Sequence, residues 1–156
     1  MSIRTATEND APYISALCEE VQRLHATALP EVYRPASQET FPVRTVCELM
    51  ASPDRVFFIA DVDGEPAGYL YAELQHQPET PFLRAMDMLY LHHISVHPRF
   101  KRHGIGSELM DAVKSWAKVR GVSTVKLHVC AFNETAMAFF ESAGYARLSQ
   151  SMVAQV

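Results

Sequence analysis

A strand-like segment, a basic turn and two closely spaced glycines follow one another in this chain, and together they dictate a specific local fold. Residues 86–96 are rich in apolar side chains, Pro98 ends that strand, and Gly104 and Gly106 precede a helical apolar pattern. Glycines at a strand-to-helix junction leave backbone N–H groups open to an anion, and the helix dipole adds positive charge. We therefore expect a phosphate-binding turn here.

Basic side chains surround this turn, although the chain as a whole is acidic. Arg99, Lys101, Arg102 and His103 lie beside the glycines, whereas the net charge of the 156 residues is −4. Binding to nucleic acid through overall charge is therefore not expected. The local cluster predicts a diphosphate cradle with these contacts: Lys101, Arg102, His103, Gly104, Ile105, Gly106 and Ser107.

Composition places the chain among ordinary globular proteins. At 156 residues, with 48% hydrophobic and 21% charged residues, it is expected to form a single domain over residues 1–156. We expect no membrane association, since no apolar segment is long enough to cross a bilayer and the N-terminus lacks a signal-peptide pattern. The three cysteines form no paired motif, so we expect no disulfide framework, no metal site and a cytoplasmic location.

Hydrophobic periodicity gives an element order of β-α-α-β-β-β-α-β-α-β. Apolar runs predict strands at 3–5, 56–60, 68–74, 86–96, 125–129 and from 145 onward. Helical spacing predicts helices across 14–24, 43–50, 109–117 and 133–144, and Asp63-Gly64 is typical of a hairpin turn. This order predicts an α/β (α+β) fold with a mixed, mostly antiparallel twisted sheet and helices on both faces.

Two sequence motifs carry a resemblance to a known family. Residues 101–106, Lys-Arg-His-Gly-Ile-Gly, are similar to the pyrophosphate-binding pattern Q/R-x-x-G-x-G/A, with lysine keeping the charge at the first position. Residues 133–145 are similar to N-x-x-A-x-x-x-Y-x-x-x-G-F/Y, with matches at Asn133, Ala136, Gly144 and Tyr145. Together with the element order, these motifs resemble the GNAT (GCN5-related N-acetyltransferase) superfamily along nearly the whole chain.

The resemblance implies that acetyl-CoA lies where the strands at 86–96 and 125–129 splay apart. Backbone around Ile94, Ser95 and Val96 would pair with the pantetheine arm, and Asn133 and Phe140 would lie along it. The family places a tyrosine, the acid that protonates the departing thiolate, where this chain has Phe140. Either Tyr90 or Tyr145 replaces it, water assists the thiolate, or activity is low.

The catalytic base is sought on the strand at 86–96. His92 occupies a position that resembles a histidine in the arylalkylamine N-acetyltransferases, and histidine titrates in a range suited to a base. Tyr90 lies two residues earlier, so both side chains are expected to face the cleft, and His93 the other way unless a bulge intervenes. We predict His92 and Tyr90 as catalytic residues; the alternative for His92 is a buried, hydrogen-bonded strand histidine.

The acceptor side is predicted from the segment after the first helix, which walls this region in the family. It contains four candidate substrate contacts: His25, Glu31, Tyr33 and Arg34. An ordinary solvated loop would contain the same residue types. The acceptor is expected to be a small-molecule or peptide amine, and its identity stays open.

Three functions from different classes fit these features. The leading one is an N-acetyltransferase that moves the acetyl group of acetyl-CoA to a primary amine by direct attack. The alternative is a catalytically weak or silent acyl-CoA-binding or sensing module, which Phe140 permits. The third is an interaction subunit, because few residues follow Gly144 and a partner could complete the sheet. A homodimer through the C-terminal strand fits the first function as well.

Overall fold

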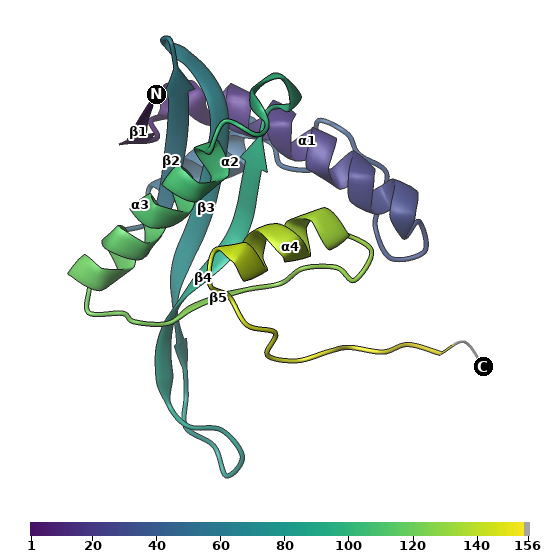
Figure 1. Cartoon of the computed structure of the whole chain (residues 1–156), viewed down its shortest axis with the longest axis vertical. Coiled ribbons are helices and arrows are strands. Elements are labelled where there is room, and N and C mark those ends of the chain that lie inside the picture. The colour runs from purple at the N-terminus through teal and green to yellow at the C-terminus, as the bar shows by residue number, and fades with distance from the viewer. Residues whose placement is uncertain (155–156) are drawn as a thin grey trace.

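The computed structural model describes residues 1–154 (Figure 1). Its strands are β1 (Ser2–Thr5), β2 (Arg55–Val62), β3 (Glu65–Gln77), β4 (Met86–Val96) and β5 (Val125–Leu127), and its helices are α1 (Ala11–Ala28), α2 (Val43–Met50), α3 (Ile105–Val119) and α4 (Glu134–Ser142). The strands form one sheet in the order β1-β2-β3-β4-β5, antiparallel except for the parallel β4–β5 pair. The predicted mixed, mostly antiparallel sheet is confirmed.

Helices cover both faces of the sheet, as predicted. Side chains alternate along a strand, so Phe57 and Ile59 of β2 join a core cluster with α1 and α2, whereas Val56 and Phe58 join a second cluster with α3 and α4. Figure 1 shows α3 and α4 on one side of the twisted sheet. The sheet is therefore the middle of three layers.

Local sequence signals set two of the connections. Asp63 and Gly64 both have positive φ, +52° and +83°, which makes the predicted β2–β3 hairpin turn of type I′. In the 3₁₀ turn Glu8–Asp10, which precedes α1, the Thr7 N–H donates to Asp10 Oδ2 (2.7 Å) and forms a capping box. Arg4 binds the same carboxylate at 2.8 Å, and this hydrogen bond is the largest cause that lowers the pKa of Asp10.

The β3–β4 hairpin is longer than predicted. β3 was expected to end at residue 74, but it continues to Gln77 and pairs with β4 as far as Met86. Figure 1 shows this hairpin projecting beyond the rest of the sheet, and Phe82 at its tip is 94% exposed. The alternation of apolar and polar residues fades here because no helix among residues 1–154 covers the projecting end of the hairpin (Figure 1).

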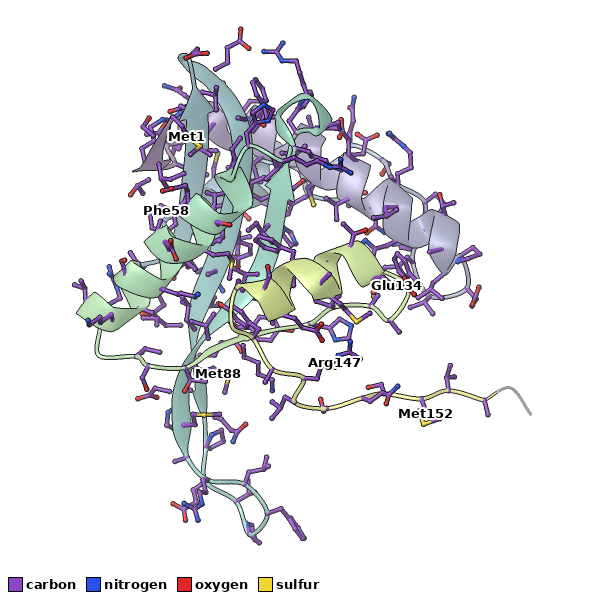
Figure 2. The ribbon with its side chains drawn as sticks, viewed as in Figure 1. Met1, Phe58, Met88, Glu134, Arg147 and Met152 are labelled. Carbon is purple, nitrogen blue, oxygen red and sulfur yellow. The ribbon has the colours of Figure 1, made fainter. Side chains whose placement is uncertain are left out.

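The predicted strand at 145–156 is not formed over residues 145–154, and its last two residues lie outside the described part of the chain. The segment instead runs away from the domain (Figure 1), with Arg147 and Met152 projecting from it (Figure 2). Its apolar side chains have no surface to cover, and Leu148, Met152 and Val153 are 76%, 92% and 94% exposed. None of the helices within residues 1–154 has the length and apolar character needed to cross a membrane.

Candidate active site

The turn between β4 and α3 has the backbone conformation of an anion-binding site. Gly104, the N-cap residue of α3, has a φ of +76°, and Arg102 has a φ of +66°. Positive φ values turn neighbouring N–H groups toward one side of the chain, and they favour glycine. Within residues 1–154, a Cβ at Gly104 would meet no atom closer than 4 Å. Open space therefore lies in front of this turn.

The first turn of α3 supplies N–H groups that have no partner inside the helix. The earliest α3 hydrogen bond runs from the Glu108 N–H to the Gly104 carbonyl (3.2 Å), so the amides of Ile105, Gly106 and Ser107 precede the bonded part of the helix. The Ile105 side chain is 1% exposed and anchors this turn in the core. The amides and the helix dipole together fit an anion such as a diphosphate.

Two of the basic side chains have partners within the protein. Arg99 pairs with Glu65, and the His103 ring donates from Nδ1 to the Lys101 carbonyl (2.9 Å). Lys101 and Arg102 are exposed, and neither forms an ion pair with any residue from 1 to 154. The charges free for a ligand are therefore those of Lys101 and Arg102.

Gly106 allows α3 and α4 to approach each other closely. A Cβ at this position would lie 3.0 Å from Phe139 Cζ and 3.2 Å from its Cε2. The second glycine of the motif therefore has a packing role that the sequence analysis did not assign to it. This contact places α4 beside the turn that precedes α3.

β4 and β5 part in the middle of β4. Their registered pairs are Leu89–Val125, Tyr90–Lys126 and Leu91–Leu127, and the part of β4 from residue 92 to 96 pairs only with β3 in the described chain. One backbone edge around Ile94, Ser95 and Val96 is therefore open. This opening leads from the middle of β4 to the basic turn, as expected.

A β-bulge lies where the two strands part. Tyr71 pairs with His93 and Ala72 with Leu91, so His92 is the extra residue of β4. The bulge places His92 and His93 on the same face, and both rings contact Tyr71. His93 therefore does not face away from His92, because a bulge, the exception allowed for in the sequence analysis, breaks the alternation here.

His92 is held between an aromatic ring and a carboxylate. Its ring stacks on Tyr71 with centroids 4.7 Å apart and planes at 14°, and it lies 4.9 Å from the ring of Tyr90. Its Nε2 is 3.0 Å from Glu73 Oε2, and its side chain is 28% exposed. The two predicted catalytic residues, His92 and Tyr90, therefore lie together on the α1 and α2 face.

His93 packs against the core on that face. Its Nδ1 accepts a hydrogen bond from the Tyr69 hydroxyl (3.2 Å), and its ring packs edge-on against Phe41 and Tyr71. Burial, with a smaller effect of neighbouring His92, lowers the pKa of His93 to about 4. His93 is therefore a neutral structural residue at neutral pH.

α4 begins and ends as the sequence predicts, but Phe140 lies in the core. Asn133 Oδ1 accepts the N–H of Ala136 (3.1 Å) and caps the helix. Phe140 is 7% exposed and packs against Tyr145, with ring centroids 5.8 Å apart. Burial raises the pKa of Tyr145 to about 12, and its hydroxyl has no partner within residues 1–154.

Two of the four acceptor candidates come together. His25 packs against Tyr33 and Phe132, with centroids 5.0 and 5.3 Å away, and the Tyr33 hydroxyl is 2.9 Å from Cys130 Sγ. The Cys130 contact raises the pKa of Tyr33 to about 12. These contacts join the loop after α1 to the segment before α4, whose first residue, Glu134, is labelled in Figure 2.

Glu31 and Arg34, the other two acceptor candidates, are exposed. They make no ion pair with residues 1–154. The Arg34 carbonyl accepts a hydrogen bond from the Gln22 side chain. The structure does not bring these two residues into the aromatic cluster. Within the same residues, no three His, Cys, Asp or Glu side chains gather in a group that could hold a metal ion.

Sequence reasoning missed Glu73, which connects three strands. It accepts from Arg55 of β2 (2.7 Å) and lies against His92 of β4. Burial opposes its ionisation, but hydrogen bonds from Gln75, His92 and Arg55 lower the pKa of Glu73 overall. One sequence signal could have identified it. Glu73 follows Tyr69 and Tyr71 at a spacing of two, so its carboxylate lies on a strand face that is otherwise buried.

A comparison with protein families matches residues 18–145 to the Acetyltransferase (GNAT) family. Among relatives, an uncharacterized N-acetyltransferase in the pepI 3′ region of Lactobacillus delbrueckii subsp. lactis is 26% identical over 96% of this chain and 87% of its own length. The chain spans only about two fifths of the length of several other curated relatives, 42% in one and 41% in another.

Solved structures share the fold at low identity. A mutant of the BH1408 protein from Bacillus halodurans has a TM-score of 0.94 and 23% identity over 100% of this chain and 99% of its own. The aminoglycoside N-acetyltransferase AAC(6′)-Iy in complex with CoA has a TM-score of 0.72 and 17% identity, covering 99% of this chain and 98% of its own. At these identities the likeness concerns the fold.

Proposed function

We propose, from the premise that this chain belongs to the Acetyltransferase (GNAT) family, that it transfers the acetyl group of acetyl-CoA directly to a primary amine. The observation that carries the proposal is one continuous path on β4. It runs from the basic turn at Gly104, along the open strand edge, to His92 at the point where β5 parts from β4. The CoA complex of a solved protein with this fold supports the same ligand.

The parts of this path match the parts of acetyl-CoA. The free amides at Ile105–Ser107 and the charges of Lys101 and Arg102 suit the diphosphate. The open edge at residues 94–96 suits the amide groups of the pantetheine arm, which would pair as an added strand. Asn133 lies at the start of α4, whose helix packs against Gly106, so α4 would form the other wall.

His92 is proposed as the base that removes a proton from the attacking amine. His92 lies on the face of the sheet that α1 covers, and this is also the face of the proposed acceptor side. Tyr90 lies beside it. Tyr90 is the better substitute for the missing acid at Phe140, because the Tyr145 hydroxyl is enclosed in the core on the other face. His25 and Tyr33 would form the acceptor wall.

The acceptor is proposed to be a small-molecule or peptide amine. The aminoglycoside N-acetyltransferase with this fold supports an amine acceptor in general terms. The three free cysteines suit a reducing cytoplasm, which is the proposed location. A second candidate, a silent acyl-CoA-binding module, is favoured by the buried phenyl ring of Phe140; acceptor-dependent release of CoA thiol would exclude it.

Acetyl-CoA is expected to stabilise the protein against thermal unfolding. Ligand at about 100 times its Kd adds about 2.7 kcal/mol to the free energy of unfolding, which raises Tm measurably. The double variant Lys101→Glu and Arg102→Glu is expected to lose most of this shift, because it places negative charge beside the diphosphate. Differential scanning fluorimetry with and without acetyl-CoA measures both.

A matched control for this experiment reverses two exposed charges elsewhere. Arg84→Glu and Lys118→Glu change the net charge equally, at the β3–β4 hairpin and at the far end of α3. This variant is expected to keep the full shift. Equal losses in both double variants would show an effect of total charge, and no shift in the wild type at millimolar acetyl-CoA would contradict the cradle.

A homodimer is proposed through the segment at 146–154, which is extended and has no neighbour in the sheet. β5 is paired on one side only in the described chain, and a strand from a second copy could extend the sheet there. We expect a dimer by analytical ultracentrifugation, and a monomer for Leu148→Asp with Met152→Asp. A monomeric wild type at micromolar concentration would contradict this arrangement.

A further inference from the structure

The two carboxylate oxygens of Glu73 contact different partners. Oε1 accepts from Arg55 Nε (2.8 Å) and Nη2 (2.7 Å), whereas Oε2 lies 3.0 Å from His92 Nε2 and 3.2 Å from Gln75 Nε2. The side chain is 19% exposed. Because Arg55 grips Oε1 with two donors, the carboxylate cannot rotate freely, and Oε2 stays directed at the His92 ring.

The chemistry of this contact identifies the proton on His92. An ionised carboxylate only accepts hydrogen bonds, so Nε2 must carry the hydrogen that it donates to Glu73. In the neutral imidazole the other nitrogen, Nδ1, then holds the lone pair. No hydrogen bond to His92 Nδ1 is formed by any residue from 1 to 154. Stacking on Tyr71 fixes the plane of the same ring.

We propose that Glu73 is a positioning residue that holds His92 as the Nε2–H tautomer, so that Nδ1 is the atom that receives the proton of the attacking amine. The inference rests on the proposed function of His92. Nδ1 takes one proton as the amine nitrogen bonds to the thioester carbonyl carbon. The carbon–sulfur bond then breaks with its electron pair on sulfur, and one proton returns to that sulfur to give the CoA thiol and an amide.

Arg55 belongs to the same arrangement. Registered cross-strand pairs place Arg55 of β2 and Tyr90 of β4 opposite Glu73, and His92, two residues after Tyr90, reaches the same carboxylate. Alternation along β4 keeps His92 on the face of Tyr90, and the bulge adds His93 to that face. The pairing of the strands therefore sets the face of His92, and the carboxylate sets its tautomer.

The test is the tautomer of His92, measured by long-range ¹H–¹⁵N NMR on protein labelled in histidine. The His92→Gln variant assigns the signals. In the wild type at neutral pH, we expect a protonated Nε2 and an unprotonated Nδ1. Glu73→Leu is expected to give a mixture of both tautomers. Glu73→Gln is expected to favour the Nδ1–H tautomer, because its one amide oxygen accepts from Arg55 and its N–H₂ group then faces Nε2. We expect kcat for Glu73→Leu to fall about tenfold, less than on removal of the base.

Asp87→Leu is the matched control, since Asp87 forms the other acid–histidine pair of the same hairpin, with His76 at 2.6 Å. It is expected to leave the His92 tautomer and kcat unchanged. A wild-type Nδ1–H tautomer, or an unchanged tautomer in Glu73→Leu, would overturn the role of Glu73. If the tautomer changes in Glu73→Leu but neither Glu73→Leu nor His92→Gln lowers kcat, His92 is not the base. Glu73 then sets the tautomer of His92 without a role in catalysis.

Discussion

Replacing His92 by glutamine is expected to lower kcat/KM about 100-fold at neutral pH, because a positioned base contributes at least that factor to proton transfer. Glutamine can occupy the place of the ring and accept or donate a hydrogen bond to Glu73, but it cannot take up a proton from the amine. The measurement is acceptor-dependent release of CoA thiol at saturating acetyl-CoA. It requires an amine acceptor, which screening of small and peptide amines would supply.

The control for this substitution is His76→Gln, a change of the same kind on the exposed β3–β4 hairpin. It is expected to leave kcat/KM unchanged. Both variants should keep the thermal shift with acetyl-CoA, since neither side chain lies at the basic turn. A kcat/KM for His92→Gln within about threefold of the wild type would exclude His92 as the base.

Local sequence signals predicted most of the elements and the glycine turn that precedes α3. Asp63-Gly64 requires positive φ at both positions, Gly104 stands at a strand-to-helix junction, and Asn133 caps the helix that follows it. Each of these signals acts over a few neighbouring residues, so the sequence alone contains it. The same applies to the alternation of β2, which serves a different helix layer on each face.

The candidate catalytic group could be predicted only in part, because its geometry depends on pairing between strands. His92 and Tyr90 were identified, but the bulge exists only in the register of β3 against β4. That register turns His93 onto the same face and brings Glu73, nineteen positions earlier in the chain, to His92. No pattern within β4 alone contains this information.

The C-terminal segment shows that a local apolar pattern is not sufficient to form a strand. Its apolar residues suggested a strand, yet a strand needs a partner, and residues 145–154 have none within the described chain. Strand propensity reflects packing against neighbours more than the backbone itself. Packing with other parts of the chain also decides the position of Phe140. The family motif implied a side chain beside the ligand, whereas packing with Tyr145 encloses Phe140 in the core.

The partly buried His93 is expected to make the protein less stable as the pH falls from about 6.5 to about 4. Its pKa is about 4 in the folded protein, because burial disfavours the charged ring, and about 6.5 in the unfolded chain. Between these values the unfolded state binds a proton that the folded state does not, so the free energy of unfolding decreases with decreasing pH. Above pH 6.5 both states are neutral at this residue, and its contribution is constant.

The expected loss between pH 7 and pH 4.5 from this residue is about 2 to 3 kcal/mol. His93→Asn removes the titration while its amide oxygen can still accept from the Tyr69 hydroxyl. We expect this variant to be less stable at pH 7, since Phe41 and Tyr71 lose a ring contact, but to lose about 2 to 3 kcal/mol less than the wild type on acidification. Urea unfolding at several pH values measures how the free energy of unfolding of each protein changes with pH, provided that the m-value stays the same. Parallel pH profiles for the two proteins would mean that His93 already takes up its proton in the folded state, and the neutral, structural role assigned to it would be wrong.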